Sequence, residues 1–447
     1  MDALDTISLL LDKARAGGAD VADAVMFETV DISASRRMGK PEGLERSENK
    51  AVGLRAFVGQ QQAIVSGTDT GRQALAELAE RAVSMAKATP ADPDSQLAPE
   101  SLYGKKIPNL DLFDGDEPNA EWLANQCKEA EEAALSVRGI TNSEGADAHY
   151  GKSRINLAIA NGKNIGFAQS YDSSHFSVSV SVLAGTGTAM ERDYDFTSAR
   201  HRRNLEEAAS IGLRAAERTL KRLGPRKVTT CRVPVIFDPR LSRSILGILA
   251  GSISGASIAR GSSFLKDSLH QKIFPESVRI IDDPHIKSGM GSKPFDAEGV
   301  KNEKRALIDN GILTTWLLDM RSANKLKMTT TGHATRGVAS PPSPSATNLY
   351  MEKGKLSPTE LIQDIQSGFY VTEAYGMGVN TVTGDYSQGA AGFWIENGVI
   401  AYPVSEITIA GHLREMFAHI TPADDLVFRY ATNAPTLRIE SMTIAGV

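Results

Sequence analysis

The chain has 447 residues, of which 41% are hydrophobic and 23% charged, and 54 Asp and Glu stand against 49 Lys and Arg. These values exclude a collagen-like, coiled-coil or largely disordered chain, and the formal net charge of −5 gives no overall preference for nucleic acid. At roughly 150 residues per domain, we expect two or three domains. The two cysteines, Cys127 and Cys231, cannot build a disulfide framework, so we expect a reducing compartment.

Neither an export signal nor a membrane span is predicted. Asp2 and Asp5 lie where an export signal would carry positive charge. The uncharged stretch 173–190 alternates apolar and serine residues with the period of a strand. The stretch 245–259 is shorter than a membrane span and is interrupted by glycines. We therefore expect a cytoplasmic protein.

The first 90 residues read as an N-terminal α+β domain. Helical spacing and strand alternation predict, in order, a helix over 4–16, strands over 24–29, 32–36 and 51–65, and a helix over 72–87. A proline-rich connector follows and indicates a domain boundary. Its prolines are Pro90, Pro93, Pro99 and Pro108.

A central α+β domain is predicted over residues 91–226, either separate from the first or packed with it as one N-terminal half. It has a helix near 119–136, strands through 141–188, and a long helix near 198–223 that ends before Gly224-Pro225. The basic segment 200–232 carries ten Lys or Arg and three Glu but has no aromatic residues for base stacking. We favour a solvated or partner-binding helix face over nucleic-acid binding.

The remainder, 227–447, is predicted to be rich in short strands. A strand at 233–237 is followed by Asp238 as the cap of a helix whose first position is Pro239. Asn397-Gly398 fits the two positive-φ positions of a hairpin turn between 393–396 and 399–404. The fold class is therefore α+β, an α/β N-terminal half followed by a C-terminal half dominated by antiparallel β-strands.

No complete catalytic constellation emerges from the residues themselves. The segment 145–153 has one residue too many between its glycines for a phosphate-binding loop. The segment 251–255 has Ile253 where a nucleophilic serine would stand. No two histidines lie three or four residues apart, and the least poor metal candidates are His412, Glu415 and His419. We favour a polar surface helix for these three.

Several segments, in this order over some 300 residues, resemble the TldD/TldE (PmbA) peptidase family. They are Asn142-Ser143-Glu144-Gly145 and residues 234–239, 260–265, 291–299, 383–387, 393–403, 407–411 and 435–439. Chains of the TldD branch carry His-Glu-x-x-x-His on the helix before the Gly-Ser-Ser segment, which is Gly261-Ser262-Ser263 in this chain. They also carry a cysteine near the carboxy terminus as a further metal ligand. At the matching positions this chain has Leu246, Gly247 and Gly251, and it has no cysteine over 423–433.

The resemblance therefore implies the TldE (PmbA) branch. It implies no catalytic residue, metal or cofactor in this chain, and zinc in a TldD-type partner subunit with which it forms a heteromer. That complex would cleave short or unfolded peptides. We expect this chain to shape the enclosed chamber and to hold extended peptides along strand edges of its C-terminal half. Candidates for a peptide groove are Leu246, Gly247, Gly251 and Ser252, because their helix replaces the active helix of the sister subunit.

Two alternatives stay open. One is an independent metallopeptidase that uses His412, Glu415 and His419. The other is a non-enzymatic modulator that binds DNA gyrase or nucleic acid, for which the basic segment 200–232 is the only support. Whether the chain forms a homodimer when alone is also left open.

Overall fold

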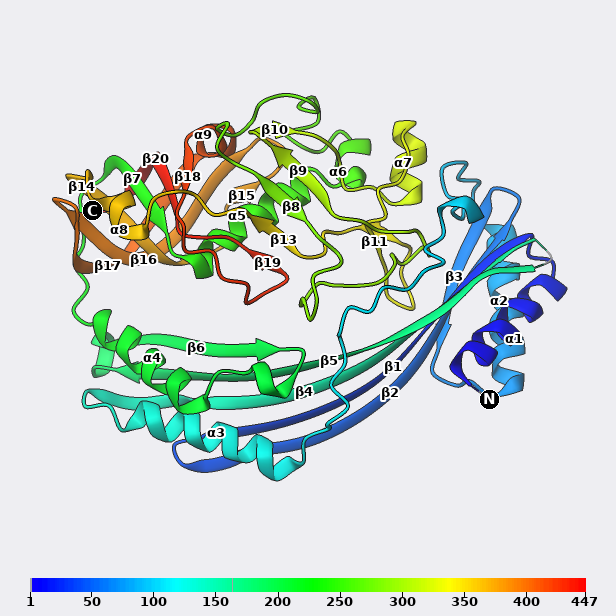
Figure 1. The fold of residues 1–447 in the computed structure, drawn as a ribbon, viewed down its shortest axis with the longest axis horizontal. Coiled ribbons are helices and arrows are strands. Elements are labelled where there is room, and N and C mark those ends of the chain that lie inside the picture. Colours follow the sequence, from blue (N-terminus) through cyan, green and yellow to red (C-terminus); the bar gives the residue numbers. More distant parts are fainter. Residues whose placement is uncertain (1, 163) are drawn as a thin grey trace.

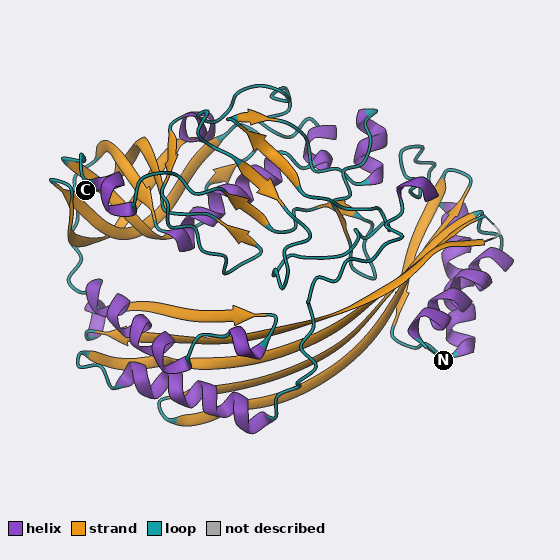
Figure 2. Cartoon of the chain, in the orientation of Figure 1, coloured by secondary structure: helices purple, strands orange, loops and turns teal. Residues whose placement is uncertain are grey.

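The computed structural model describes residues 2–162 and 164–447. Helices make up 24% of the structure and strands 40%. The α+β class is confirmed. One long curved sheet carries helices on its convex side, and the C-terminal half lies over its concave side (Figure 1). Figure 2 shows that the curved sheet consists of long strands, whereas short strands and loops lie above it. None of the helices in these described ranges has the length and apolar character of a membrane-spanning segment.

The curved sheet is antiparallel and has six strands in the order β3-β2-β1-β4-β5-β6. Its strands are β1 (Val21–Arg37), β2 (Lys40–Val58), β3 (Gln61–Gly67), β4 (Ile140–Asn161), β5 (Asn164–Ala184) and β6 (Glu191–Ala199). Because β1 pairs with both β2 and β4, the segments 1–90 and 91–226 contribute to one sheet. The strands predicted over 24–29 and 32–36 are one strand, since Asp31 stays in register with Ser47 and Gly151.

Two pairs of helices cover the convex side of the sheet. They are α1 (Ala3–Ala16) with α2 (Arg72–Ala88) at one end, and α3 (Ala120–Leu135) with α4 (Ala208–Lys221) at the other. The prediction of a helix over 198–223 is wrong at its start: residues up to Ala199 form β6, and the helix begins at Ala208. The strand extends to Ala199 because Ser198 and Ala199 pair with Ser177 and Phe176 of β5.

The C-terminal half contains a small barrel. β14 (Ser367–Tyr375) pairs with β7 and also with β16, which closes the ring β14-β7-β20-β17-β16. The other members are β7 (Cys231–Phe237), β16 (Asp385–Glu396), β17 (Val399–His412) and β20 (Leu437–Ala445), with β15 (Val379–Asn380) and β18 (Ile420–Pro422) attached. The predicted hairpin turn between β16 and β17 is confirmed, with φ of +48° at Asn397 and +78° at Gly398.

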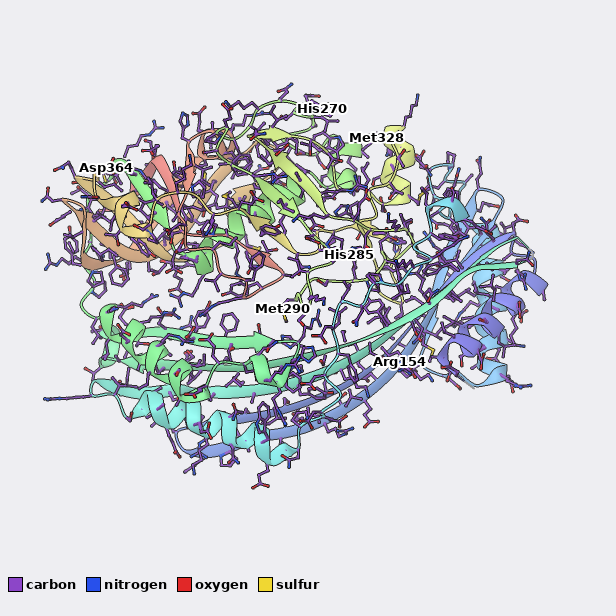
Figure 3. The ribbon with its side chains drawn as sticks, in the orientation of Figure 1. Arg154, His270, His285, Met290, Met328 and Asp364 are labelled. Atoms are coloured by element: carbon purple, nitrogen blue, oxygen red, sulfur yellow. The ribbon has the colours of Figure 1, made fainter. Side chains whose placement is uncertain are left out.

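A second sheet and several short elements complete this half. The sheet is β10-β9-β8-β13-β19, made of β8 (Ile280–Asp282), β9 (Arg305–Asp309), β10 (Ile312–Leu313), β13 (Leu349–Met351) and β19 (Thr432–Asn433). The remaining pieces are β11 (Ala334–Thr335), β12 (Ser343–Pro344), α6 (Gly255–Ala259), α7 (Met320–Leu326), α8 (Pro358–Ile362) and α9 (Leu413–Ala418). The loop from β8 to β9 reaches the curved sheet with Met290 at its lower end (Figure 3), where Arg200 Nε donates to Gly289 O at 3.4 Å.

Helix α5 (Pro239–Ser252) packs into the core of the C-terminal half. Its start is as predicted: Asp238 accepts a hydrogen bond from the Arg240 N–H at 2.9 Å, and Pro239 is the first helical residue. Leu246 and Leu249 are fully buried on one face of the helix. The opposite face carries Gly247 and is turned away from the core, which brings it to the candidate site.

Candidate functional site

A cavity of about 470 Å³ lies beside α5, between the two halves of the chain. Four arginines, Arg192, Arg222, Arg240 and Arg243, dominate its wall, and we call it the arginine pocket. The wall is completed by Asp193, Tyr194, Leu241, Ser244, Gly247, Thr372, Glu373, Ala374 and Thr432. It therefore draws on β6 and the end of α4 from the curved sheet, and on α5, β14 and β19 from the C-terminal half.

Three of the four arginines are held by carboxylates. Arg222 lies 2.7 Å from Glu373 and 3.3 Å from Glu191, and Arg240 Nη1 donates to Asp193 at 2.8 Å. Arg192 lies 3.7 Å from Glu373. Burial acts to lower the Arg222 pKa, but the surrounding carboxylates outweigh it and hold that pKa above its usual value. These pairs fix the pocket wall and join β6 to α5 and β14.

Arg243 differs from the other three. No carboxylate lies within 4.0 Å of it among the described residues, and its Nε donates to Arg240 O at 3.2 Å. Its guanidinium stands 4.1 Å from the centre of the Tyr430 ring, a cation–π contact that orients the group. Arg243 is exposed, so its remaining N–H groups are free to bind a ligand.

A second contact between the two halves is fully buried, and we call it the buried junction. It consists of Asp23 and Arg55 from the sheet with Glu298 and Arg336 from the C-terminal half. Asp23 accepts hydrogen bonds from Arg55 Nε at 2.9 Å and from Arg336 Nη1. Apolar contacts surround these charges: Val25, Leu157, Ile159, Phe167, Phe295, Val300 and Met320.

Burial raises the pKa of both carboxyl groups of the buried junction, but the net shifts are opposite. Burial pushes the Asp23 pKa upward, but the charges of Arg336 and Arg55 prevail and hold that pKa below its ordinary range. Burial raises the Glu298 pKa well above its ordinary value, and the nearby Asp296 and Asp319 add to the rise. Glu298 accepts a hydrogen bond from the Met320 N–H at 2.8 Å, which fixes the carboxyl group in place.

The structure separates the four residues predicted for a peptide groove. Leu246 and Ser252 face the core, and Ser252 donates its hydroxyl to Ile248 O at 2.8 Å. Gly247 and Gly251 are exposed, four residues apart on one helix face, and a Cβ at either would meet open space. Only Gly247 lines the arginine pocket. The helical period of 3.6 residues explains the split, since 246 and 247 point in different directions.

The positions aligned with the metal motif do not fit a zinc ion. Leu246 is a buried apolar side chain, and Gly247 and Gly251 have no side chain to offer a ligand atom. Across residues 2–162 and 164–447, no group of three or more His, Cys, Asp or Glu is arranged to hold a metal ion. These three positions of α5 therefore offer no side-chain ligand to a metal ion.

His412, Glu415 and His419 do not share the helix face that the sequence indicated. His412 ends β17 and caps α9, a helix of only six residues, and its Nε2 lies 3.1 Å from Thr383 O. His419 follows the helix, with Nδ1 3.0 Å from Glu415 O and 3.7 Å from the Glu415 carboxylate. The three are not brought together as a ligand set, because a strand ends where the helix was expected to continue.

Sequence reasoning missed a polar cluster on the concave face of the curved sheet. His149 Nε2 lies 3.2 Å from Asp31 Oδ1, and the His149 and His175 rings are 5.9 Å apart. Burial, with His149 and Arg200 nearby, lowers the His175 pKa to about 4. The three cluster residues come from β1, β4 and β5, so only strand register could have revealed them.

Most of the basic segment 200–232 is neutralised within the chain. Seven of its ten cations lie within 4.0 Å of a carboxylate: Arg202, Arg203, Arg214, Arg218, Lys221, Arg222 and Lys227. Two of these, Arg214 and Arg218, share the buried Asp195. The segment is therefore largely a structural ion-pair network.

Comparison with protein families matches nearly the whole chain. Residues 22–86 match PmbA/TldA metallopeptidase domain 1, residues 113–223 match the central domain, and residues 230–446 match the C-terminal domain. Metalloprotease PmbA of Escherichia coli O157:H7 is 38% identical over 446 residues, covering 99% of this chain and 96% of that protein. The PmbA homolog of Haemophilus influenzae is 35% identical and covers 98% and 95%.

Solved structures agree with this fold. A Bacteroides thetaiotaomicron protein named as a modulator of DNA gyrase superposes with a TM-score of 0.91 at 26% identity, covering 99% of this chain and 98% of that one. TldE from Thermococcus kodakarensis superposes with a TM-score of 0.84 at 19% identity, covering 99% and 100%. The second likeness is one of fold alone.

Proposed function

Because the chain belongs to the PmbA/TldA metallopeptidase family, we propose that it is a TldE-type subunit without a metal site of its own. It would work in the cytoplasm with a TldD-type metallopeptidase subunit, which supplies the zinc, and the complex would cleave short or unfolded peptides. The observation that carries the proposal is the segment of α5 that aligns with the metal motif. Where ligands would stand, it has a buried leucine and two open glycines, and Gly247 borders a cavity.

The structure offers few strand edges in the C-terminal half along which an extended peptide could pair. The expected strand edges of the C-terminal half are scarce, because the five-stranded ring closes through the pairing of β14 with β16. Next to the arginine pocket, β6 is an edge strand, but the Tyr194 N–H donates to Asp193 Oδ1 and the Tyr194 carbonyl accepts from Arg240. We therefore propose that side chains of the arginine pocket, rather than a strand edge, contact the peptide.

The first test is metal content together with activity. The chain, purified without chelators or a histidine tag, is analysed for zinc by elemental mass spectrometry and assayed on an unfolded peptide, alone and with a TldD-type partner. We expect near-zero zinc, no hydrolysis alone, and hydrolysis by the mixture that exceeds that of the partner alone. About one zinc per chain, retained through dialysis, or hydrolysis by the chain alone would contradict the proposal.

A matched pair of variants addresses the independent-peptidase alternative. His412→Ala and His419→Ala remove the least poor metal candidates, both of which are surface groups. We expect both variants to leave the activity of the mixture unchanged. A loss of activity in both, with the fold retained by circular dichroism, would favour a metal site on this chain.

A further inference from the structure

We propose that the arginine pocket binds one carboxylate of a short peptide through Arg243. This inference rests on the proposed function, in which the chain handles peptides, and adds the chemistry by which it recognises them. The carboxylate would come from the free C-terminus of the peptide or from an Asp or Glu side chain. Both sources share one chemistry, and the test below separates them.

Arg243 is the cation that the pocket leaves available. Arg192, Arg222 and Arg240 are each held by at least one carboxylate of the chain, whereas Arg243 has none within 4.0 Å among the described residues. A guanidinium presents its N–H groups as a planar fork that matches the two oxygens of a carboxylate. The contact with the Tyr430 ring at 4.1 Å restricts the orientation of that fork, so less freedom is lost when a carboxylate binds.

The pocket wall favours a single carboxylate rather than an extended anion. Asp193 and Glu373 also face the cavity, and each is tied to arginines of the wall. Because these carboxylates occupy Arg192, Arg222 and Arg240, only one guanidinium of the wall is left for a negative charge of the ligand. A nucleic-acid backbone or a polyphosphate is therefore a poor occupant, and one carboxylate at the end of a neutral chain is a good one.

The shape of the cavity fits the end of a peptide. Its volume of about 470 Å³ lies in the range of small-molecule sites. Gly247 leaves open space where any other residue would place a side chain. Ala374, Leu241 and Thr432 line the cavity with small or medium-sized side chains. Because the Tyr194 backbone groups are already hydrogen-bonded, charge and shape must hold the ligand at this point.

The test is fluorescence anisotropy with the full chain and a labelled Gly-Ala-Ala-Ala peptide in three forms. The forms carry a free C-terminal carboxylate, a C-terminal amide, or a C-terminal amide with an Asp in place of one alanine. We expect the free acid to bind, and Arg243→Gln to weaken it roughly ten- to hundredfold, the value of a charged hydrogen bond. Binding of the Asp-containing amide but not of the plain amide would assign the carboxylate to a side chain.

Two further variants keep the test decisive. Arg81→Gln, on the exposed face of α2 far from the pocket, removes another exposed arginine and should leave binding unchanged. Gly247→Leu fills the open space beside α5 and should also weaken the free acid at least tenfold. Equal binding of all three peptide forms, no effect of Arg243→Gln, or full competition by equimolar inorganic phosphate would each overturn the proposal. Since binding is measured without the partner, its outcome is independent of whether the complex hydrolyses peptides.

Discussion

The buried junction and the arginine pocket join the same two halves of the chain with the same chemistry, yet they differ in access to water. At the buried junction the side chains of Asp23, Arg55 and Arg336 are 0%, 3% and 1% exposed. At the arginine pocket the Arg192 side chain is 50% exposed and the Glu373 side chain is 35% exposed. Arg336 of the first site borders only a small cavity of about 110 Å³, whereas the second site borders one of about 470 Å³.

The difference in solvation separates a structural contact from a site that can bind a ligand. Each buried charge depends on its partners, because an unpaired charge in a dry environment is strongly unfavourable. Solvated ion pairs contribute little to stability, so their members can exchange one partner for another at small cost. The chain therefore uses the buried junction to fix the two halves and leaves the pocket open to exchange.

The largest expected effect comes from breaking the buried junction. Asp23→Asn removes the carboxylate that pairs with both Arg55 and Arg336, and we expect the free energy of unfolding to fall by about 3–5 kcal/mol. Urea unfolding followed by tryptophan fluorescence measures it. Asp364→Asn is the control, because Asp364 pairs with Arg438 at a surface position that is 68% exposed. Equal losses in the two variants would contradict the comparison.

The pH dependence of the buried junction should show the raised Glu298 pKa. A carboxyl group whose pKa is higher in the folded protein stabilises the fold fully below its unfolded pKa, and this stabilisation is lost as the pH rises through the folded pKa. The effect is about 1.4 kcal/mol for each unit between the two pKa values. We expect Glu298→Gln to flatten the decline in unfolding free energy from pH 5 upward, because the neutral amide does not titrate.

The control for this pH series is Glu80→Gln, which changes an exposed carboxylate on α2. That variant should keep the slope of the unmodified chain. If Glu298→Gln retains the same slope as Glu80→Gln, then Glu298 does not titrate in the folded protein as its burial indicates.

At the open site, filling the glycine position on α5 should stabilise the chain. Alanine is favoured over glycine within a helix by about 0.5–1 kcal/mol, and a Cβ at Gly247 meets open space. We expect Gly247→Ala to raise the unfolding free energy by that amount in urea unfolding. Gly212→Ala, in α4, provides the contrast: its Cβ would lie 2.1 Å from Ala130 O, so the same substitution should destabilise. A loss of stability in Gly247→Ala would mean that the pocket is not open.

The smallest effect is expected from the ion pairs of the pocket. Glu373→Gln removes the partner of Arg222 at 2.7 Å, and we expect a loss of about 0.2–1 kcal/mol because the site is partly solvated. Raising the salt concentration should shrink the difference further, since screening already weakens the pair. Unfolding in urea at low and high salt measures both, and a loss as large as that of Asp23→Asn would remove the distinction between the two sites.

Local elements were predictable wherever their signals lie within a few residues. The cap at Asp238 with Pro239 and the hairpin turn at Asn397-Gly398 were found from the sequence, because their hydrogen bonds and backbone angles depend on adjacent residues. The helix expected over 198–223 begins only at Ala208, since Ser198 and Ala199 still pair with β5 and Arg202–Asn204 form a separate short turn. The family resemblance also rested on short segments and is confirmed over the chain.

By itself, the sequence determined the family, the α+β class and the absence of ligand atoms at Leu246, Gly247 and Gly251, because each depends on which residue stands at a position. Only the tertiary structure decided that β1 unites two segments in one sheet, and that Gly247 borders a cavity while Leu246 is buried. It also decided that, among the described residues, no carboxylate lies within 4.0 Å of Arg243. The physical reason is distance along the chain. Asp23 and Arg336 are separated by 313 residues, and no local preference records which of many charges will be enclosed together.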